Sequence, residues 1–153
     1  MKLILEYSKF LSELLQDYAG PGLSLVSFGA ATLLPFSSEA ALMGAIWSGL
    51  SPVEAVFWAS IGNCAACAFN YSLGYWFGKK IETRISESKT YAGWAERMSR
   101  WGYWALGFSF LPFVGDPITV LSGFFRQKFW IFALIVFSLR ILRYIVLAYG
   151  FGP

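Results

Sequence analysis

The stretch Leu34-Pro35-Phe36-Ser37-Ser38-Glu39 interrupts a long, mostly apolar segment in its middle. Proline lacks an N–H and clashes with a continuing helix, so a helix should break at this point. Inside a membrane, such a break is tolerated only where protein or a watery cavity satisfies the freed backbone groups. An ionisable side chain at that depth indicates a functional site. The stretch therefore predicts a broken membrane helix with a functional acid, Glu39.

A second version of this stretch follows later as Leu111-Pro112-Phe113-Val114-Gly115-Asp116. The Leu-Pro-Phe triplet is identical in both, and Asp116 takes the place of Glu39. Interrupted hydrophobic segments at corresponding positions of two halves are the best sequence indication of a transport site. We therefore expect two structural repeats whose broken tips each carry one acid.

The composition predicts an integral membrane protein. Hydrophobic residues make up 57% and charged residues 14% of the 153 residues, whereas soluble domains have about 45–50% and about 25%. The absence of histidine excludes His-dependent triads and His-ligated metals. The Ser and Asp positions show no nucleophile–base pair either. We therefore expect no enzyme, no cofactor or metal and, at a net charge of +3, no nucleic-acid partner.

The whole chain, 1–153, is interpreted as one membrane domain. Residues 1–20 place apolar side chains at helical spacing opposite charged ones, which predicts an amphipathic helix at the interface. We expect Gly20-Pro21-Gly22 to end this helix. The later segments are a re-entrant hairpin at 23–49, a transmembrane helix at 52–78, a basic cytoplasmic loop or helix at 79–100, a second re-entrant hairpin at 101–125 and a transmembrane helix at 127–151. A single kinked spanning helix is the alternative for residues 23–49.

Charge distribution predicts the orientation. Residues 79–100 carry six basic and three acidic side chains and thus the whole net charge. Basic loops stay cytoplasmic, so both termini are expected on the other side. If each hairpin returns to its own side and each following helix crosses once, the two halves are inverted. The predicted fold class is therefore an all-α membrane protein of two inverted repeats, each a re-entrant helical hairpin followed by a transmembrane helix, plus the N-terminal amphipathic helix.

The last segment carries two arginines, Arg140 and Arg143, well inside its apolar run. They are three residues apart and therefore lie on one helix face. Deep arginines are costly unless they are paired or hydrated. We expect them to pair with Glu39, Asp116 or an anionic ligand rather than to extend to the membrane surface.

The segment 52–78 carries polar residues of its own. Asn63 and Asn70 are seven apart and share a helix face, where they could line a transport path or only join helices. Cys64 and Cys67 form the only CxxC. Without a second CxxC or any histidine, small-residue helix packing explains them better than metal or redox chemistry.

These motifs resemble those of the DedA family, membrane proteins with a VTT or SNARE-associated Golgi protein domain, and are most similar to its short YqaA-like branch. The likeness covers roughly residues 20–150. It rests on 34–39, Asn70–Lys79, Phe110–Pro117, Ser122-Gly123 and Arg140.

The resemblance implies lipid transport across the bacterial inner membrane. Members are similar to flippases or scramblases for undecaprenyl phosphate or phosphatidylethanolamine, some of them proton-coupled. The family's essential acids correspond to Glu39 and Asp116, and an essential arginine corresponds to Arg140 or Arg126. After Pro112 this chain has Phe-Val-Gly-Asp-Pro where the larger branch has an arginine-containing motif. The substrate and the assignment of Arg126 therefore stay open.

The predicted function is transport of a phosphate-bearing lipid headgroup. Guanidinium groups bind phosphate through paired hydrogen bonds, and helix N-termini after the tips add positive dipole ends. Protonation of an acid would then let a headgroup enter or leave. The candidate substrate- and proton-binding residues are Glu39, Asp116, Arg140, Arg143, Arg126 and Asn70, and the candidate hairpin-tip residues are Pro35, Ser37, Ser38, Pro112, Gly115 and Pro117.

Two other functions fit the same residues. In a non-transporting scaffold, the acids and arginines would be buried ion pairs that fix the packing. A small proton-coupled solute exporter would need a closed water path instead of a groove open to lipid. A chain this short is also compatible with a homodimer that encloses the pathway.

Overall fold

The structure, a computed structural model, describes residues 18–32, 37–85, 96, 102–111 and 115–150, with the side chains of 81–85 excluded. All regular structure in these ranges is helical. The elements are a helix over 18–32, α2 (Ser38–Trp47), α3 (Pro52–Ile85), a helical segment at 102–106 that leads into the 3-10 helix η1 (Gly107–Phe110), α5 (Gly115–Phe124) and α6 (Phe129–Gly150). Residues Pro52–Lys80 and Phe129–Gly150 are long and apolar enough to cross a membrane. The prediction of an all-helical chain with two candidate spanning helices is therefore confirmed for the described residues.

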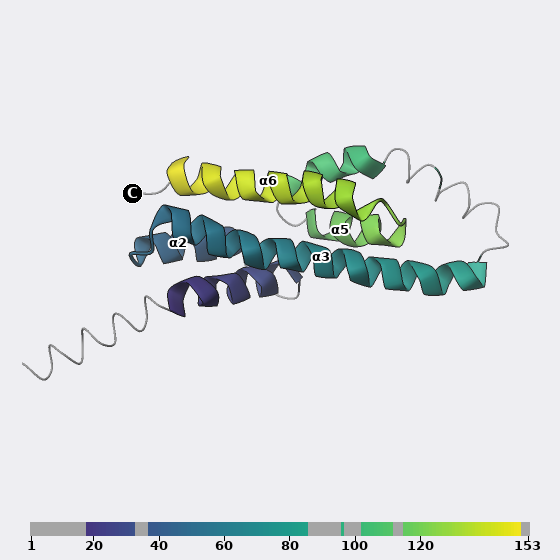
Figure 1. The fold of residues 1–153 in the computed structure, drawn as a ribbon, viewed down its shortest axis with the longest axis horizontal. Coiled ribbons are helices and arrows are strands. Elements are labelled where there is room, and N and C mark those ends of the chain that lie inside the picture. The colour runs from purple at the N-terminus through teal and green to yellow at the C-terminus, as the bar shows by residue number, and fades with distance from the viewer. Residues whose placement is uncertain (1–17, 33–36, 86–95, 97–101, 112–114, 151–153) are drawn as a thin grey trace, which may run out of the picture.

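The long helix α3 organises the molecule (Figure 1). Helix α6 runs antiparallel along α3. Helix α2 contacts both α3 and α6, whereas α5 contacts α3 and η1. Residues 18–32 and α2, here called the first helix pair, lie along the N-terminal half of α3. Residues 102–110 and α5 are called the second helix pair: α5 lies along the C-terminal half of α3, and residues 102–110 lie beside α6 (Figure 1). The two pairs approach each other near the middle of α3, and this position defines the site described below.

Glycines on α3 bring the neighbouring helices into backbone contact. A Cβ on Gly62 would lie 1.9 Å from the carbonyl oxygen of Ser24, and one on Gly74 would lie 1.9 Å from that of Val120. Small residues are what allow membrane helices to approach so closely, because the packing of surfaces replaces the hydrophobic effect in lipid. One helix of each pair, 18–32 in the first and α5 in the second, thus makes direct main-chain contact with α3.

Among the described residues, the apolar core forms two clusters, one toward each end of the helix bundle. The first contains Leu23, Leu42, Ile46, Ala55, Ala59, Tyr144 and Ala148. The second contains Cys67, Tyr71, Leu106, Phe132, Ala133 and Val136. On α3 and α6, the stretch between the two clusters holds the buried polar residues Asn63 and Arg140. The core is therefore divided by a polar layer in the middle of the molecule.

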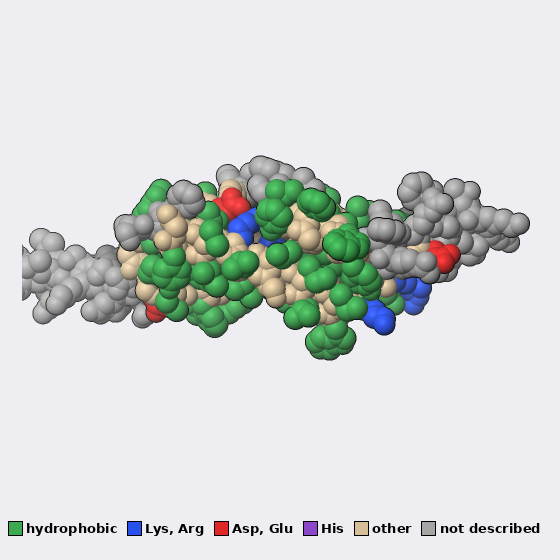
Figure 2. Space-filling model, turned by 90° about the horizontal axis from the view of Figure 1, so that it is seen from above, with side chains coloured by type: hydrophobic (Ala, Val, Ile, Leu, Met, Phe, Trp, Pro, Cys, Tyr) green, Lys and Arg blue, Asp and Glu red, His purple; other side chains and the backbone are tan. Residues whose placement is uncertain are grey.

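The outer surface is strongly hydrophobic, as Figure 2 shows for one face. Trp130, Leu25 and Leu134 are 82%, 75% and 71% exposed. Extended exposed apolar surface marks an interaction with membrane or protein. On the face shown in Figure 2, acidic and basic side chains lie next to each other among hydrophobic ones, near the middle of the molecule.

One predicted boundary was wrong. Gly20-Pro21-Gly22 does not end a helix, because residues 18–32 form one helix through it. Gly20 instead serves packing, since a Cβ there would lie 2.3 Å from the indole nitrogen of Trp58. Proline's fixed φ is compatible with a helix, at the cost of one hydrogen bond. Helix α3 continues to Ile85, into the segment 79–100 that was predicted as a basic loop or helix, and its candidate spanning part is Pro52–Lys80. The predicted amphipathic helix at 1–20 lies largely outside the described residues.

Candidate functional site

Arg140 is the buried centre of the polar layer. Its side chain is 3% exposed, and its Nη2 donates to Asp116 Oδ1 at 2.6 Å. Asp116 lies in the first turn of α5 and is 32% exposed. A buried guanidinium is tolerated only when it is paired, so this contact accounts for the presence of Arg140 in the core of the bundle.

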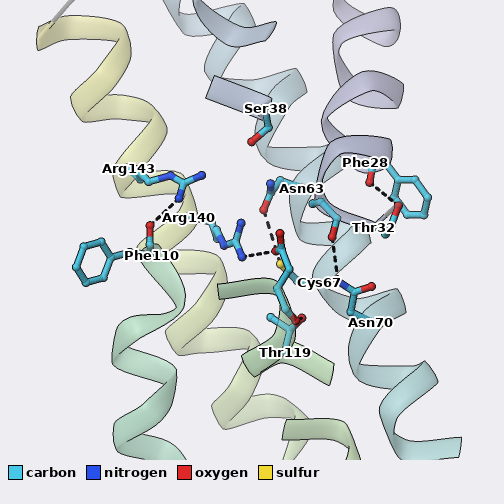
Figure 3. A network of polar contacts seen from close by, with 12 residues as sticks. Phe28, Thr32, Ser38, Asn63, Cys67, Asn70, Phe110, Thr119, Arg140 and Arg143 are labelled. Carbon is cyan, nitrogen blue, oxygen red and sulfur yellow. Dashed lines mark hydrogen bonds and ion pairs between the residues drawn. The ribbon is translucent and has the colours of Figure 1, made fainter. Parts of the chain in front are cut away.

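Arg143, one helical turn further along α6, joins the two helix pairs. Its Nη2 lies 2.8 Å from Glu39 Oε1, and its Nη1 donates to the carbonyl oxygen of Phe110 at 2.6 Å. Glu39 belongs to α2, whereas Phe110 ends η1. Arg143 is 14% exposed and Glu39 is 28% exposed, so this pair is partly accessible from outside. Figure 3 shows both arginines extending from α6 into a shared polar network.

Both acids occupy the first turn of a helix. The side chain of Ser37 caps α2: it accepts from the backbone N–H of Ala40 and donates to Glu39 Oε2 at 3.0 Å. The N-terminal end of a helix carries a partial positive charge, which stabilises a nearby carboxylate or another anion. The two N-termini, of α2 and α5, thus reach α6 at neighbouring turns and add positive potential to that of the arginines.

Close packing fixes the position of these groups. A Cβ on Gly115 would lie 2.2 Å from the carbonyl oxygen of Ser109 and 2.8 Å from Nη2 of Arg140. Only glycine therefore fits at this position. The two acid–arginine pairs, Arg140–Asp116 and Arg143–Glu39, are here called the central cluster. On its other side, the hydroxyl of Tyr144 donates to Ser38 Oγ at 2.8 Å, a buried contact that joins α6 to α2.

Four buried polar atoms of this layer have no hydrogen-bond partner within the described structure. They are Arg140 Nε, Arg143 Nε, Asn63 Nδ2 and Ser109 Oγ. The first three can only donate, and Ser109 can donate as well. Buried polar atoms normally have partners, and each exception calls for an explanation such as water, an ion or a functional role. The layer therefore offers an excess of donors, which suits a ligand rich in acceptor oxygens.

Two predicted site residues lie away from the cluster. Asn70 donates from Nδ2 to the carbonyl oxygen of Ala31 at 3.0 Å and is 5% exposed, so it joins α3 to the first helix pair. Arg126 follows the C-terminal end of α5, the end opposite Asp116, and its guanidinium lies 5.5 Å from the centre of the Tyr75 ring. Neither is brought together with the acids.

The remaining predicted tip residues have mixed positions. Ser37 and Ser38 begin α2, and Gly115 and Pro117 lie in the first turn of α5. Proline in the first turn is compatible with a helix because the missing N–H would have no partner there. Pro35 and Pro112 lie outside the described residues.

Some residues of the network were not predicted from the sequence. Asn63, whose Oδ1 accepts from Cys67 Sγ at 3.7 Å, was predicted only as a polar residue of the helix face (Figure 3). Tyr144 could have been found, since it lies four residues after Arg140 and thus on the same helix face. Ser109 and the Phe110 carbonyl have no sequence signal, because a main-chain oxygen is present at every residue.

Comparison with known proteins identifies the family. The family model of the VTT domain matches residues 34–151. The inner membrane protein YqaA of Escherichia coli (strain K12) is 34% identical over 123 residues, which cover 80% of this chain and 83% of that protein. An uncharacterized protein of Haemophilus influenzae is 28% identical over 138 residues, covering 83% of each chain. An uncharacterized protein of Methanocaldococcus jannaschii is 24% identical over 139 residues, covering 90% of this chain and 87% of that one. No solved structure matches the chain.

The match spans α2, the second helix pair, both candidate spanning helices and both acid–arginine pairs, and it leaves out the helix over 18–32. Together with the apolar surface and the inner-membrane relative, it establishes a protein of the bacterial inner membrane. The chain belongs to the DedA family of VTT-domain membrane proteins.

Proposed function

We propose that this protein moves the phosphate-bearing headgroup of a membrane lipid across the inner membrane, as a flippase or scramblase. The observation that carries the proposal is the pair of Arg143 and Glu39, which is partly exposed although it lies halfway along an otherwise apolar molecule. A charged group at such a depth is costly and is kept where function requires it.

The proposal includes the membrane arrangement. Helix α2 has ten residues and is about 15 Å long, which is too short for a hydrocarbon core of about 30 Å. The same holds for α5, whereas α6 with 22 residues is long enough to span. We propose that 23–49 and 101–125 are re-entrant hairpins that enter from opposite sides, so that the two halves form inverted repeats with tips at mid-bilayer.

The donors of the cluster match the acceptors of a phosphate. A guanidinium can bind two phosphate oxygens at once through parallel hydrogen bonds. Nε of Arg143 is free of protein partners in the described structure, and Nη2 is engaged only by Glu39. If a phosphate replaces the carboxylate of Glu39 and Glu39 takes up a proton, one negative charge is exchanged for another. The net charge of the central cluster then stays near zero. Headgroup binding is thereby coupled to the uptake of a proton by Glu39.

The two pairs have different roles in this proposal. Arg140 is almost fully buried and is held against Asp116 and Gly115, so we assign to this pair the fixed part of the site. Arg143 and Glu39 are more exposed, so we assign to them the exchange with the headgroup. The acyl or prenyl tails would stay in the bilayer while the headgroup crosses.

The experiment is headgroup translocation in proteoliposomes made with purified protein. The variant is Glu39→Gln, which keeps the size of the side chain and removes the charge. The matched control is Glu54→Gln, because Glu54 lies in the first turn of α3, bonds to Ser51 and is exposed. We expect flux to be lost in the first variant and kept in the control. Equal flux in wild type and Glu39→Gln contradicts the proposal.

A scaffold is the second candidate, favoured by the one-to-one pairing of acids with arginines. In a scaffold, these pairs only fix the packing of the helices. Removing one partner would then lower the stability, by about 3–5 kcal/mol for a fully buried pair and by less for the partly exposed pair of Arg143 and Glu39. A transport site can instead lose activity while the protein stays stable. Loss of flux in Glu39→Gln at an unchanged midpoint of thermal unfolding in detergent therefore supports transport, whereas unchanged flux with a lowered midpoint supports the scaffold.

A further inference from the structure

We propose that a groove between α3 and α6 holds one acyl chain of an ester-linked phospholipid while its headgroup occupies the central cluster. The inference rests on the proposed function. The groove has a volume of about 400 Å³ and is lined by six residues of α3 between Val53 and Cys64 and by Ile141 of α6. This volume is in the range of pockets that bind small molecules.

The length and direction of the groove fit one acyl chain within one leaflet of the membrane. From Val53 to Cys64, α3 rises about 16 Å, and half of the hydrocarbon core is about 15 Å thick. The groove thus extends from near the start of α3 at Pro52 to its middle. Ile141, at its side, directly follows Arg140 in α6. A chain laid in the groove would therefore run from the membrane surface to the level of the cluster.

Ser60 marks where such a lipid would be held. It is 8% exposed, lines the groove, and its hydroxyl has no hydrogen-bond partner in the described structure. Some helical hydroxyls bond to the carbonyl four residues before them, as Ser72 does to Ala68 and Ser122 to Ile118, whereas Ser60, like Ser27 and Ser109, does not. Among otherwise apolar lining residues, a buried hydroxyl without a partner fits a single acceptor oxygen on an apolar ligand.

An ester carbonyl is the acceptor that fits this position. Ser60 lies one helical turn from Cys64, the inner end of the groove. In a phospholipid, the ester oxygens are a few bonds from the phosphate, so an ester at Ser60 would leave the phosphate near the cluster and the acyl chain toward Val53. A polyprenyl phosphate has no such carbonyl. The groove therefore favours an acyl-ester lipid over a polyprenyl one.

The test is photo-crosslinking in proteoliposomes with phosphatidylethanolamine that carries a diazirine in one acyl chain. Cross-linked positions are mapped by mass spectrometry. We expect them to concentrate on residues 53–64, in excess over Leu134, which is 71% exposed and does not line the groove. Ile61→Trp should fill the groove and lower this labelling about tenfold, whereas Leu134→Trp should leave it unchanged. If the labelling of each residue only follows its exposed fraction and Ile61→Trp does not change it, the proposal is overturned.

Ser60→Ala tests the role of the ester. One hydrogen bond is worth about 1 kcal/mol, so we expect labelling by the ester probe to fall about fivefold. A polyprenyl phosphate with a diazirine on its chain serves as the second probe. Stronger groove labelling by this probe than by the ester probe overturns the choice of an acyl-ester lipid.

Two further outcomes are distinguishable. The first uses an Ile61→Cys variant in which Cys64 and Cys67 are replaced. If this variant oxidises to a disulfide-linked dimer, the groove binds a second copy of the protein and the proposal is overturned. Headgroup flux is measured in the same vesicles. Specific groove labelling without any wild-type flux would support the groove and refute the proposed function, whereas flux with non-specific labelling would refute only the groove.

Discussion

Arg143 contacts Glu39 with Nη2 2.8 Å from Oε1, and three residues earlier Arg140 contacts Asp116 with Nη2 2.6 Å from Oδ1. The two pairs use neighbouring turns of the same helix but differ in burial, since Arg143 is 14% and Arg140 only 3% exposed. The cost of breaking an ion pair depends on how far the remaining charge is removed from water. The two acids should therefore respond differently to substitution.

Glu39→Gln should leave the stability nearly unchanged. The pair is partly exposed, and Arg143 keeps its bond to the Phe110 carbonyl. Exposed pairs contribute about 0–1 kcal/mol, so we expect the midpoint of thermal unfolding in detergent to stay close to that of the wild type. A loss as large as that of Asp116→Asn would indicate a structural role for Glu39.

Asp116→Asn should destabilise the protein by about 3 kcal/mol, at the low end of the range for buried pairs because Asp116 is about one third exposed. The substitution leaves the buried guanidinium of Arg140 without a counter-charge. Denaturation in mixed micelles gives the free energy of unfolding. Wild-type stability of this variant would show that Arg140 does not depend on Asp116.

Gly115→Ala should weaken both stability and transport. The added methyl group would meet the Ser109 carbonyl at 2.2 Å and the Arg140 guanidinium at 2.8 Å. Overpacking of this kind costs about 1–3 kcal/mol and would displace Arg140 from Asp116. Gly107→Ala is the matched control in the same helix pair, because nothing lies within 4 Å of its added Cβ. Equal unfolding midpoints for the two variants would contradict the close packing of Gly115 against Ser109 and Arg140.

Re-entrant hairpins predict a definite labelling pattern. In a Cys64→Ala/Cys67→Ala background, single cysteines at Gly22 and Ser48 should react with a membrane-impermeant maleimide from the same side. A cysteine at Lys128 should react from the opposite side, predicted to be cytoplasmic from the basic segment 79–100. If residues 23–49 were one kinked spanning helix, Gly22 and Ser48 would be labelled from opposite sides.

Sequence reasoning located the acids and arginines because a charge in an apolar segment needs a partner, whatever the detailed fold. It could not decide which acid contacts which arginine, since Arg140 and Arg143 share one helix face. It also could not foresee the main-chain contact of Arg143 with Phe110. The role of these residues in binding a headgroup stays a prediction.

Sequence reasoning is weakest for residues whose position depends on tertiary contacts. Gly20 carries a turn signal in the sequence, but in the fold it makes room for Trp58. Asn70 was proposed for the site because it is polar in an apolar helix, yet its amide satisfies the Ala31 carbonyl near the end of the helix over 18–32. Arg126 was proposed through the family resemblance and lies beyond the far end of α5. Local pattern does not distinguish a packing role from a functional one.

The most direct test of the central claim compares two lipids with the same acyl chains in vesicles that contain the purified protein. One lipid carries a phosphate in its headgroup and the other a neutral sugar. The account predicts protein-dependent translocation of the phosphate lipid, well above that of the neutral lipid, and its loss in Glu39→Gln. Equal translocation of both lipids, or a phosphate-lipid rate no higher than in protein-free vesicles, would contradict it.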